Sequence, residues 1–198
     1  MPLLDHFQPP LSRRMSARSF CGVWAVNVVR LLNASVLPAE YVALPYVVRE
    51  DPDDSDEMYV EVRSESRHAA VIELVNPLNK DRAKAREAFA AKCAENLRRG
   101  CGVVVVDVVT TRHADMHAEI MAMLEAEVSA GPDGLAAVAY RSIGREAEGQ
   151  LQVWPFALEV GRALPTLPLW LNGEIAIPLD LEASYTAACV DLRIRQAG

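Results

Sequence analysis

Apolar side chains recur along the first third of the chain with two different spacings. From Ser16 to about residue 34 they follow one another at intervals of three and four residues, which predicts an amphipathic helix capped by Ser16 or Ser19. Residues 41–48 then form a short apolar run, and residues 58–63 alternate apolar with polar side chains. Runs of this length and alternation predict two strands.

The most informative pattern is a pair of short apolar runs with a helical pattern between them. Residues 69–75 and 103–109 are rich in β-branched side chains, whereas residues 81–98 repeat apolar side chains at helical intervals. This order predicts a strand, a helix and a second strand, with the turn Asn-Pro-Leu-Asn before the helix. Each strand contains one carboxylate, Glu73 in the first and Asp107 in the second.

An ionised carboxylate inside an apolar strand is energetically costly unless it is paired, bound to a metal ion or placed at an opening. One interpretation of Glu73 is a structural ion pair with Arg82, Arg86 or Lys92 of the following helix. The other is a metal-binding or catalytic carboxylate at the rim of a mixed sheet. Arg82 and Arg86 project onto the apolar side of the helix, so we expect them to meet a carboxylate or a bound phosphate.

The second half of the chain predicts a further helix at about 114–128, a hairpin of 136–143 with 151–154, and a final helix at about 182–193. Residues 161–171, which contain several prolines, predict an extended segment between the hairpin and that helix.

The histidines and cysteines form no familiar metal-binding pattern. His113 and His117 are four residues apart on the predicted helix, but a third ligand is missing, so two solvent-facing histidines are favoured over a zinc site. The cysteines lack C-x-x-C spacing and predict buried free thiols: Cys21, Cys93, Cys101 and Cys189.

Length and charge limit the classes of function. The chain has 198 residues and a net charge of −7, which gives no overall attraction to nucleic acid or to anionic membranes. Residues 51–57 are acidic, whereas residues 80–99 hold seven Lys or Arg against three acids and predict a local basic face. The sequence shows no signal peptide and no apolar stretch of membrane-spanning length, so we predict a soluble cytoplasmic protein without a membrane partner.

The order of these elements resembles the restriction-endonuclease-like PD-(D/E)XK superfamily. The residues that carry the resemblance are the hairpin, turn, basic helix and strand in YVEVRSESRHAAVIELVNPLNKDRAKAREAFAAKCAENLRRGCGVVVVDVV, and the later segment LPTLPLWLNGEIAIPLDLEASYTAAC. They are similar to uncharacterised bacterial domains of this superfamily that share an E-L-x-S-P-x-N-K turn. The resemblance implies one α/β (α+β) domain over residues 1–198, with a mixed-sheet core at about 16–130 and a C-terminal extension, a hairpin and a helix, at about 131–198.

The resemblance also implies roles for particular residues. Glu73 matches the second motif acid, a metal ligand at the end of the central strand. The motif lysine would stand at Val75, and in several branches of the superfamily it moves to the following helix, where Lys92 matches it. The first acid is either Asp56 or Glu61 on the preceding strand.

The implied activity is hydrolysis of phosphodiester bonds in DNA. The catalytic residues would be Asp56, Glu73 and Lys92, with Mg²⁺, or Mn²⁺ in its place, bound by carboxylates from the set Asp56, Glu61, Glu73 and Asp107. Flanking phosphates would contact Lys80, Arg82 and Arg86, so DNA would lie along the face of helix 81–98. The alternative is a catalytically inactive member of the fold that acts as an interaction or structural module. Homodimers are common among such nucleases, but the sequence shows no interface.

Overall fold

The computed structural model describes residues 1–48, 57–65, 67–127, 131–132, 134–143 and 150–195. Its centre is a six-stranded mixed sheet in the order β1-β2-β3-β4-β5-β6, in which only the β3–β4 pair is parallel. The strands are β1 (Tyr41–Val48), β2 (Glu57–Ser64), β3 (Arg67–Leu74), β4 (Gly102–Asp107), β5 (Ala136–Ile143) and β6 (Gln150–Ala157). The predicted mixed α/β class is therefore confirmed.

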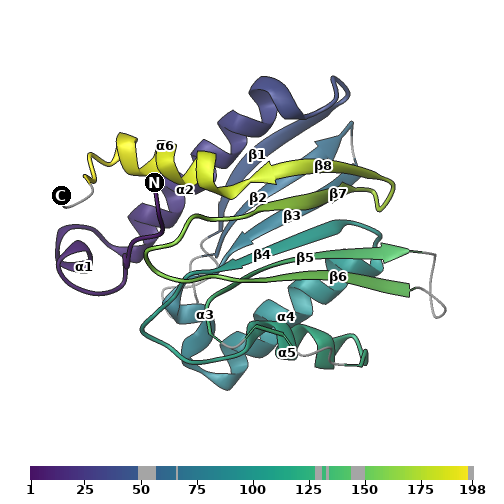
Figure 1. Cartoon of the computed structure of the whole chain (residues 1–198). Helices are drawn as coiled ribbons and strands as arrows, with labels where there is room; N and C mark the ends of the chain where they lie inside the picture. Colours follow the sequence, from purple (N-terminus) through teal and green to yellow (C-terminus); the bar gives the residue numbers. More distant parts are fainter. Residues whose placement is uncertain (49–56, 66, 128–130, 133, 144–149, 196–198) are drawn as a thin grey trace.

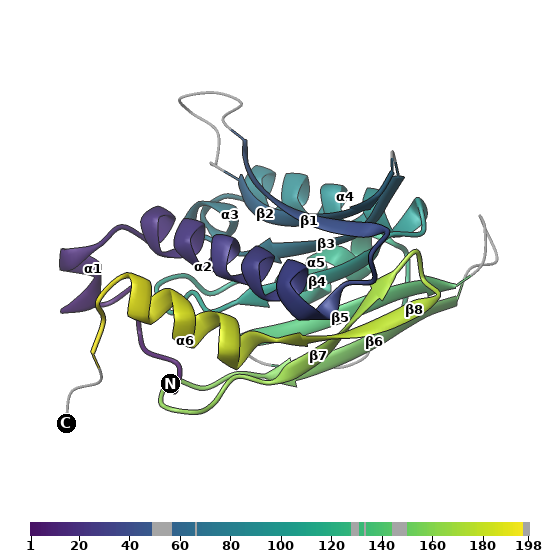
Figure 2. The same cartoon turned by 90° about the horizontal axis from the view of Figure 1, so that it is seen from above.

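Helices cover both faces of this sheet (Figures 1 and 2). One face carries α3 (Pro77–Asp81), α4 (Ala83–Arg98) and α5 (Met116–Met123). The other carries α2 (Ala17–Leu31), its π-helical continuation η1 (Leu32–Val36), α6 (Leu181–Asp191) and a two-stranded sheet of β7 (Thr166–Leu171) and β8 (Ile175–Asp180). A short helix, α1 (Leu11–Arg14), precedes α2.

The parallel β3–β4 pair exists because α4 returns the chain across the sheet. A parallel pair needs a crossover connection, and a helix is the usual one. The buried side of α4 is apolar and includes Phe89, Cys93 and Leu97, as the sequence predicted. Gly100 follows the helix with φ +82°, and its N–H donates to the carbonyl of Leu97. This left-handed residue ends the helix and directs the chain into β4.

The opposite face is closed by an aromatic cluster between α2 and α6. Trp24 is fully buried, and its ring lies 5.5 Å from that of Phe20 and 5.4 Å from that of Tyr185. The indole N–H of Trp24 donates to Oγ of Ser184 at 3.1 Å. The first helix of the sheet core and the last helix of the described chain therefore share one hydrophobic core.

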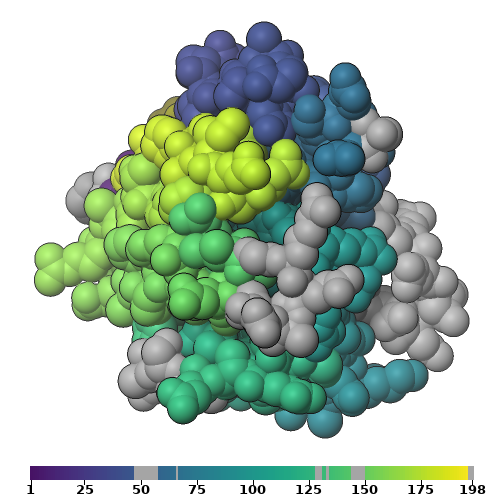
Figure 3. Space-filling model, turned by 90° about the vertical axis from the view of Figure 1, so that its right-hand side faces the viewer, coloured from purple at the N-terminus to yellow at the C-terminus, as the bar shows by residue number. Residues whose placement is uncertain are grey.

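The β7–β8 hairpin packs on the sheet through backbone contact. The N–H of Asn172 donates to the carbonyl of Ala69 at 3.0 Å, and a Cβ built on Gly102 would lie 2.0 Å from the carbonyl oxygen of Trp170. The Trp170 ring stacks at 5.5 Å on that of Trp154. Figure 3 shows this hairpin, in yellow-green, between the N-terminal elements and the green strands β5 and β6. A glycine in β4 is therefore what allows the second sheet to approach.

Most predicted elements are confirmed, and the structure differs from the sequence prediction at three places. The Asn-Pro-Leu-Asn segment starts a helix, α3, not a turn, and a second helix, α4, begins at Ala83 without a side-chain cap. Helix α5 ends at Met123, well before residue 128. The extended segment after β6 contains a strand of a separate hairpin, β7–β8. The predicted hairpin of residues 136–143 with 151–154 is confirmed as β5 and β6, and its strands continue the main sheet.

One described helix has the dimensions of a membrane span. The segment Ala17–Val36 is 20 residues long with a mean hydropathy of 1.3, so the expectation that no stretch reaches that length is wrong. Core helices of soluble proteins meet the same two criteria, and this one contributes Trp24 and Val28 to the core. The cytoplasmic location remains a prediction.

Burial of His6 makes stability depend on pH. Its ring stacks on Phe20 at 3.7 Å and its Nε2 lies 2.8 Å from the Tyr185 hydroxyl. Desolvation, opposed by the nearby Asp5, lowers the pKa of His6 to about 4. Because the unfolded chain then binds more protons than the folded one between these pKa values, stability is lost as pH falls from about 6.5 towards 4.

We expect the free energy of unfolding of the wild type to fall by about 2 kcal/mol between about pH 7 and about pH 5 because of His6. His6→Gln, which keeps a polar group near Tyr185, should lack this component. Urea unfolding at both pH values measures it, with His113→Gln as the control because His113 is exposed. Equal pH dependence in wild type and His6→Gln would contradict the assignment.

Candidate functional site

The register of the sheet places the acidic side chains on one face. Tyr59 of β2 lies opposite Glu73 of β3, and Glu73 lies beside Val105 of β4. Paired residues share a face and alternate residues along a strand return to it. Glu61 and Asp107, each two residues from one of these positions, therefore face the same side as Glu73, the side that α4 covers.

Glu73 meets a lysine from α4. The Nζ of Lys92 lies 2.8 Å from Oε2 of Glu73, whose side chain is only 2% exposed. The same ammonium lies 5.0 Å from the centroid of the Tyr59 ring and 5.5 Å from that of Phe89. Cation–π contacts of this kind hold a lysine head group in place. The Lys92 side chain is 24% exposed, so the pair reaches the edge of solvent.

A second ion pair lies further along the same face, beyond the end of β3. Asn76 caps α3 by accepting from the N–H groups of Leu78 and Asn79, and the Asn79 side chain accepts from the N–H of Asn76. This capping box fixes the one-turn helix that presents Lys80. The Nζ of Lys80 donates to Oδ2 of Asp107 at 2.8 Å.

The Lys80–Asp107 pair is buried, with side-chain exposures of 2% and 6%. Desolvation raises the pKa of Asp107, and the ammonium of Lys80 and the N–H of Val109 oppose this shift. Asp107, one of the four carboxylates considered above as metal ligands, also accepts from the N–H of Val109 at 3.1 Å. Nearby Thr110 donates to Asp5 at 2.7 Å.

Glu61 has partners at the other end of this face. Its Oε1 lies 3.1 Å from Nε of Arg63 and 2.7 Å from Nδ1 of His68, while its own side chain is 3% exposed. The guanidinium of Arg63 therefore balances the charge of this buried carboxylate at one of its two oxygens. Asp56, the other candidate for the first acid, lies outside the described residues.

The two arginines expected to face Glu73 do not reach it. Arg86 donates through Nε to Glu119 of α5 at 2.8 Å, so its partner is a carboxylate of a neighbouring helix. Arg82 is 80% exposed and lies 3.9 Å from its neighbour Asp81. Arg82 lies outside the helix because α4 begins at Ala83. The role of both arginines in phosphate binding, like that of Lys80, remains a prediction.

A buried histidine was missed by sequence reasoning. His117 was expected in solvent, but it is 5% exposed, and its Nδ1 lies 2.7 Å from the hydroxyl of Tyr140 on β5. Its Nε2 is buried without a hydrogen-bond partner among the residues that the structure describes. The partner Tyr140 is distant in sequence, so no local pattern reveals this contact. His113 is exposed as predicted.

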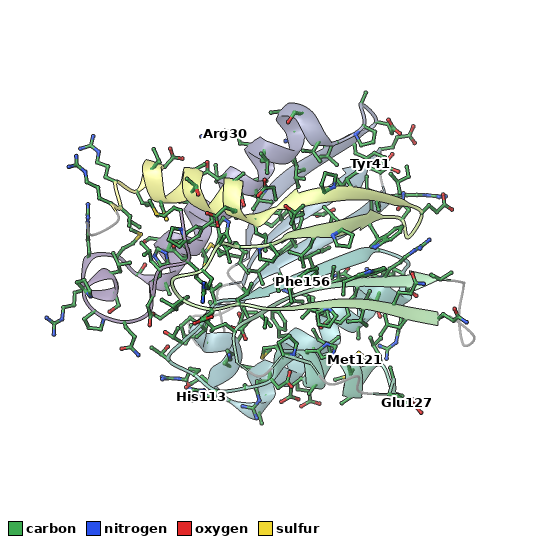
Figure 4. The ribbon with its side chains drawn as sticks, viewed as in Figure 1. Arg30, Tyr41, His113, Met121, Glu127 and Phe156 are labelled. Carbon is green, nitrogen blue, oxygen red and sulfur yellow. The ribbon has the colours of Figure 1, made fainter. Side chains whose placement is uncertain are left out.

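Two cavities open beside this histidine, at the C-terminal end of β4. The outer one has a volume of about 470 Å³ and its walls include Lys80, Thr110, Arg112, His113 and Asp115. The inner one measures about 20 Å³ and is lined by polar side chains and apolar neighbours, including Asp107, Asp115, His117 and Tyr140. Figure 4 shows His113 on the lower side of the molecule, at the end where α3 lies.

The described residues contain no group of three or more His, Cys, Asp or Glu side chains placed to hold a metal ion. All four cysteines are buried and free, as predicted. Comparison with family models, with curated proteins and with solved structures gives no match. Fold and site thus define a mixed α/β protein with two lysine–carboxylate pairs on the face of its sheet that α4 covers.

Proposed function

We propose that the protein is a metal-dependent phosphodiester hydrolase of the PD-(D/E)XK type that acts on DNA. The observation that carries the proposal is the contact between Glu73 of β3 and Lys92 of α4 at 2.8 Å. It brings together the strand carboxylate and the helix lysine that the sequence resemblance assigns to one site. The order α2-β1-β2-β3-α4-β4, with β3 and β4 parallel, supports the same assignment.

The carboxylates of the site fit a magnesium ion better than a transition metal. Mg²⁺ keeps several waters and needs only one or two protein carboxylates, so Glu73 with one further acid is sufficient. The second acid would be Asp56 or Glu61, the latter of which also contacts Arg63 and His68. When bound, Mg²⁺ supplies Lewis-acid polarisation of a phosphate and a lower pKa for an attacking water.

The residues of the chain contribute position and charge. Lys92, held by the rings of Tyr59 and Phe89, would leave Glu73 on metal binding and donate its N–H groups to the phosphate or to the attacking water. Arg82 and the exposed Lys84, at the start of α4, would hold flanking phosphates of DNA.

Calorimetric titration with Mn²⁺ tests the site. We expect saturable binding to the wild type and at least about tenfold weaker binding to Glu73→Gln, since the variant loses a charged ligand. Lys92→Met should still bind Mn²⁺ but cleave supercoiled plasmid DNA about 100-fold more slowly. Glu159→Gln, an exposed acid on the surface, is the matched control.

A second function is favoured by the burial of both ion pairs. Glu73 is 2% exposed and the Lys80–Asp107 pair is nearly as enclosed, an arrangement also suited to a structural or interaction module. In that case the wild type binds no Mn²⁺, and Glu73→Gln is destabilised without loss of any activity. That pair of results would overturn the hydrolase proposal.

A further inference from the structure

The outer cavity beside α5 has the size of a ligand site and several polar side chains on its wall, and the buried His117 lines the inner cavity next to it. A volume of about 470 Å³ lies within the range of small-molecule sites, which typically measure about 300–1,000 Å³. The cavity lies at the C-terminal end of a strand from the parallel pair β3–β4, the place where ligands bind in many α/β proteins. Its walls are separate from the Glu73–Lys92 contact.

His117 gives the inner cavity a hydrogen-bond donor. The hydroxyl of Tyr140 has Nδ1 of His117 as its neighbour, and burial raises the pKa of Tyr140 well above its ordinary value, so the hydroxyl keeps its proton. In the tautomer in which Tyr140 donates to Nδ1, the ring proton of His117 lies on Nε2. This buried N–H requires an acceptor, and a cavity of about 20 Å³ accommodates one oxygen atom.

The two cavities share Asp115 and Gly134 as wall residues, so a ligand in the outer one lies next to the inner one. At the mouth the outer cavity presents Arg112 and His113. Arg112 is half exposed and pairs with Asp81 at 3.1 Å. An exposed pair of this kind contributes little stability, so the guanidinium can turn to a ligand anion at small cost.

The exposed donors on the wall of the outer cavity indicate the ligand. Lys80 is held by the buried Asp107, so the groups that can turn to a ligand are Arg112 and His113, opposite the carboxylate of Asp115. A guanidinium provides several donors for phosphate oxygens. The single carboxylate favours hydroxyl donors on the same molecule.

We propose that this cavity binds a small phosphate ester of a polyol. Its phosphate lies at Arg112 and His113, its hydroxyl groups face Asp115, and one of its oxygens accepts from Nε2 of His117. The site does not depend on Glu73 or on a metal. Failure of the hydrolase function proposed above would therefore leave this binding site unaffected, and the reverse also holds.

Titration of the full chain with ribose 5-phosphate, followed by the histidine ring resonances, tests this site. We expect saturable binding with a Kd on the order of 1 mM or tighter, with shifts at both His113 and His117. Ribose alone should not bind, and succinate should bind at least about tenfold more weakly, since it lacks the phosphate. Arg112→Gln should weaken ribose 5-phosphate binding about tenfold, the loss of one charge-assisted contact.

Arg30→Gln is the matched control, because Arg30 is also an exposed arginine paired with an aspartate, at 3.6 Å, and lies on the opposite side of the molecule (Figure 4). It should bind like the wild type, and so should Glu73→Gln even where that variant has lost Mn²⁺. In Gly131→Ala the new Cβ would lie 2.5 Å from Cδ2 of His117, so the ring moves and binding weakens.

Three results would overturn the site. They are shifts at His113 without shifts at His117, equal affinity in Arg112→Gln and wild type, or succinate binding as tight as that of ribose 5-phosphate. Shifts at His113 alone would show only that the anion pairs with exposed cations at the surface. The absence of saturable ribose 5-phosphate binding to the wild type would overturn it as well.

Discussion

A Gly102→Ala variant is expected to be destabilised by about 3 kcal/mol or more, at the upper end of overpacking effects. The new Cβ would lie 2.0 Å from the carbonyl oxygen and 2.9 Å from the carbonyl carbon of Trp170. Both atoms belong to the backbone of β7, so no side-chain rotation relieves the overlap. Either the hairpin β7–β8 moves away from the sheet or β4 shifts in its register.

Urea denaturation followed by tryptophan fluorescence measures this change, because Trp170 and its neighbour Trp154 report on the hairpin. The matched control is Gly22→Ala, whose Cβ would meet only the flexible end of Met58, with its Sδ at 3.3 Å. Gly22 lies inside α2, where alanine is preferred by about 1 kcal/mol, so we expect no loss there. Equal stability of Gly102→Ala and wild type would show that the hairpin adapts freely.

Replacing Lys80 by methionine should lower the free energy of unfolding by about 3–5 kcal/mol near neutral pH, as expected for breaking a buried ion pair. Methionine fills a similar volume, so the main cost is the uncompensated carboxylate of Asp107, which is 6% exposed. Chemical denaturation measures the loss. Lys84→Met, at an exposed position near the start of α4, should change stability little.

The cost of Lys80→Met should fall at lower pH. Burial already raises the pKa of Asp107, and removing the ammonium that opposes this shift raises it further. A folded-state pKa above the unfolded value of about 3.9 means that the folded chain binds the extra proton, so the variant loses stability as pH rises through that window. The double variant Lys80→Met/Asp107→Leu should recover most of the loss and lack this pH dependence. Pure additivity of the two single losses would contradict the pairing.

Local patterns predicted the elements whose signals are local. The apolar spacing of α2 and the β-branched runs of β3 and β4 were sufficient to place them. The hairpin β7–β8 was missed because Pro168 and Pro178 stand opposite each other in it, and proline is uncommon inside strands. Helix α3 could have been found, since Asn76 with Pro77 and Asn79 is a helix-start signal.

The site was predictable only where a contact follows from one strand and its adjoining helix. Lys92 lies on the helix that leaves β3, so its meeting with Glu73 could be anticipated from the connection. Helical projection placed Arg82 on the buried side, but α4 starts after it, and helix boundaries are poorly determined by sequence. The burial of His117 depends on Tyr140, which joins it only through the order of strands in the sheet.

The shared core of α2 and α6 has a consequence for synthesis on the ribosome. Trp24 finds Ser184 and Tyr185 only after 160 further residues have been added, which takes roughly 10–30 s at usual elongation rates. During that interval the apolar side of α2 has the early strands to pack on but not its final helical partner. The nascent chain therefore carries an exposed hydrophobic surface that holdase chaperones can recognise until α6 emerges and covers it.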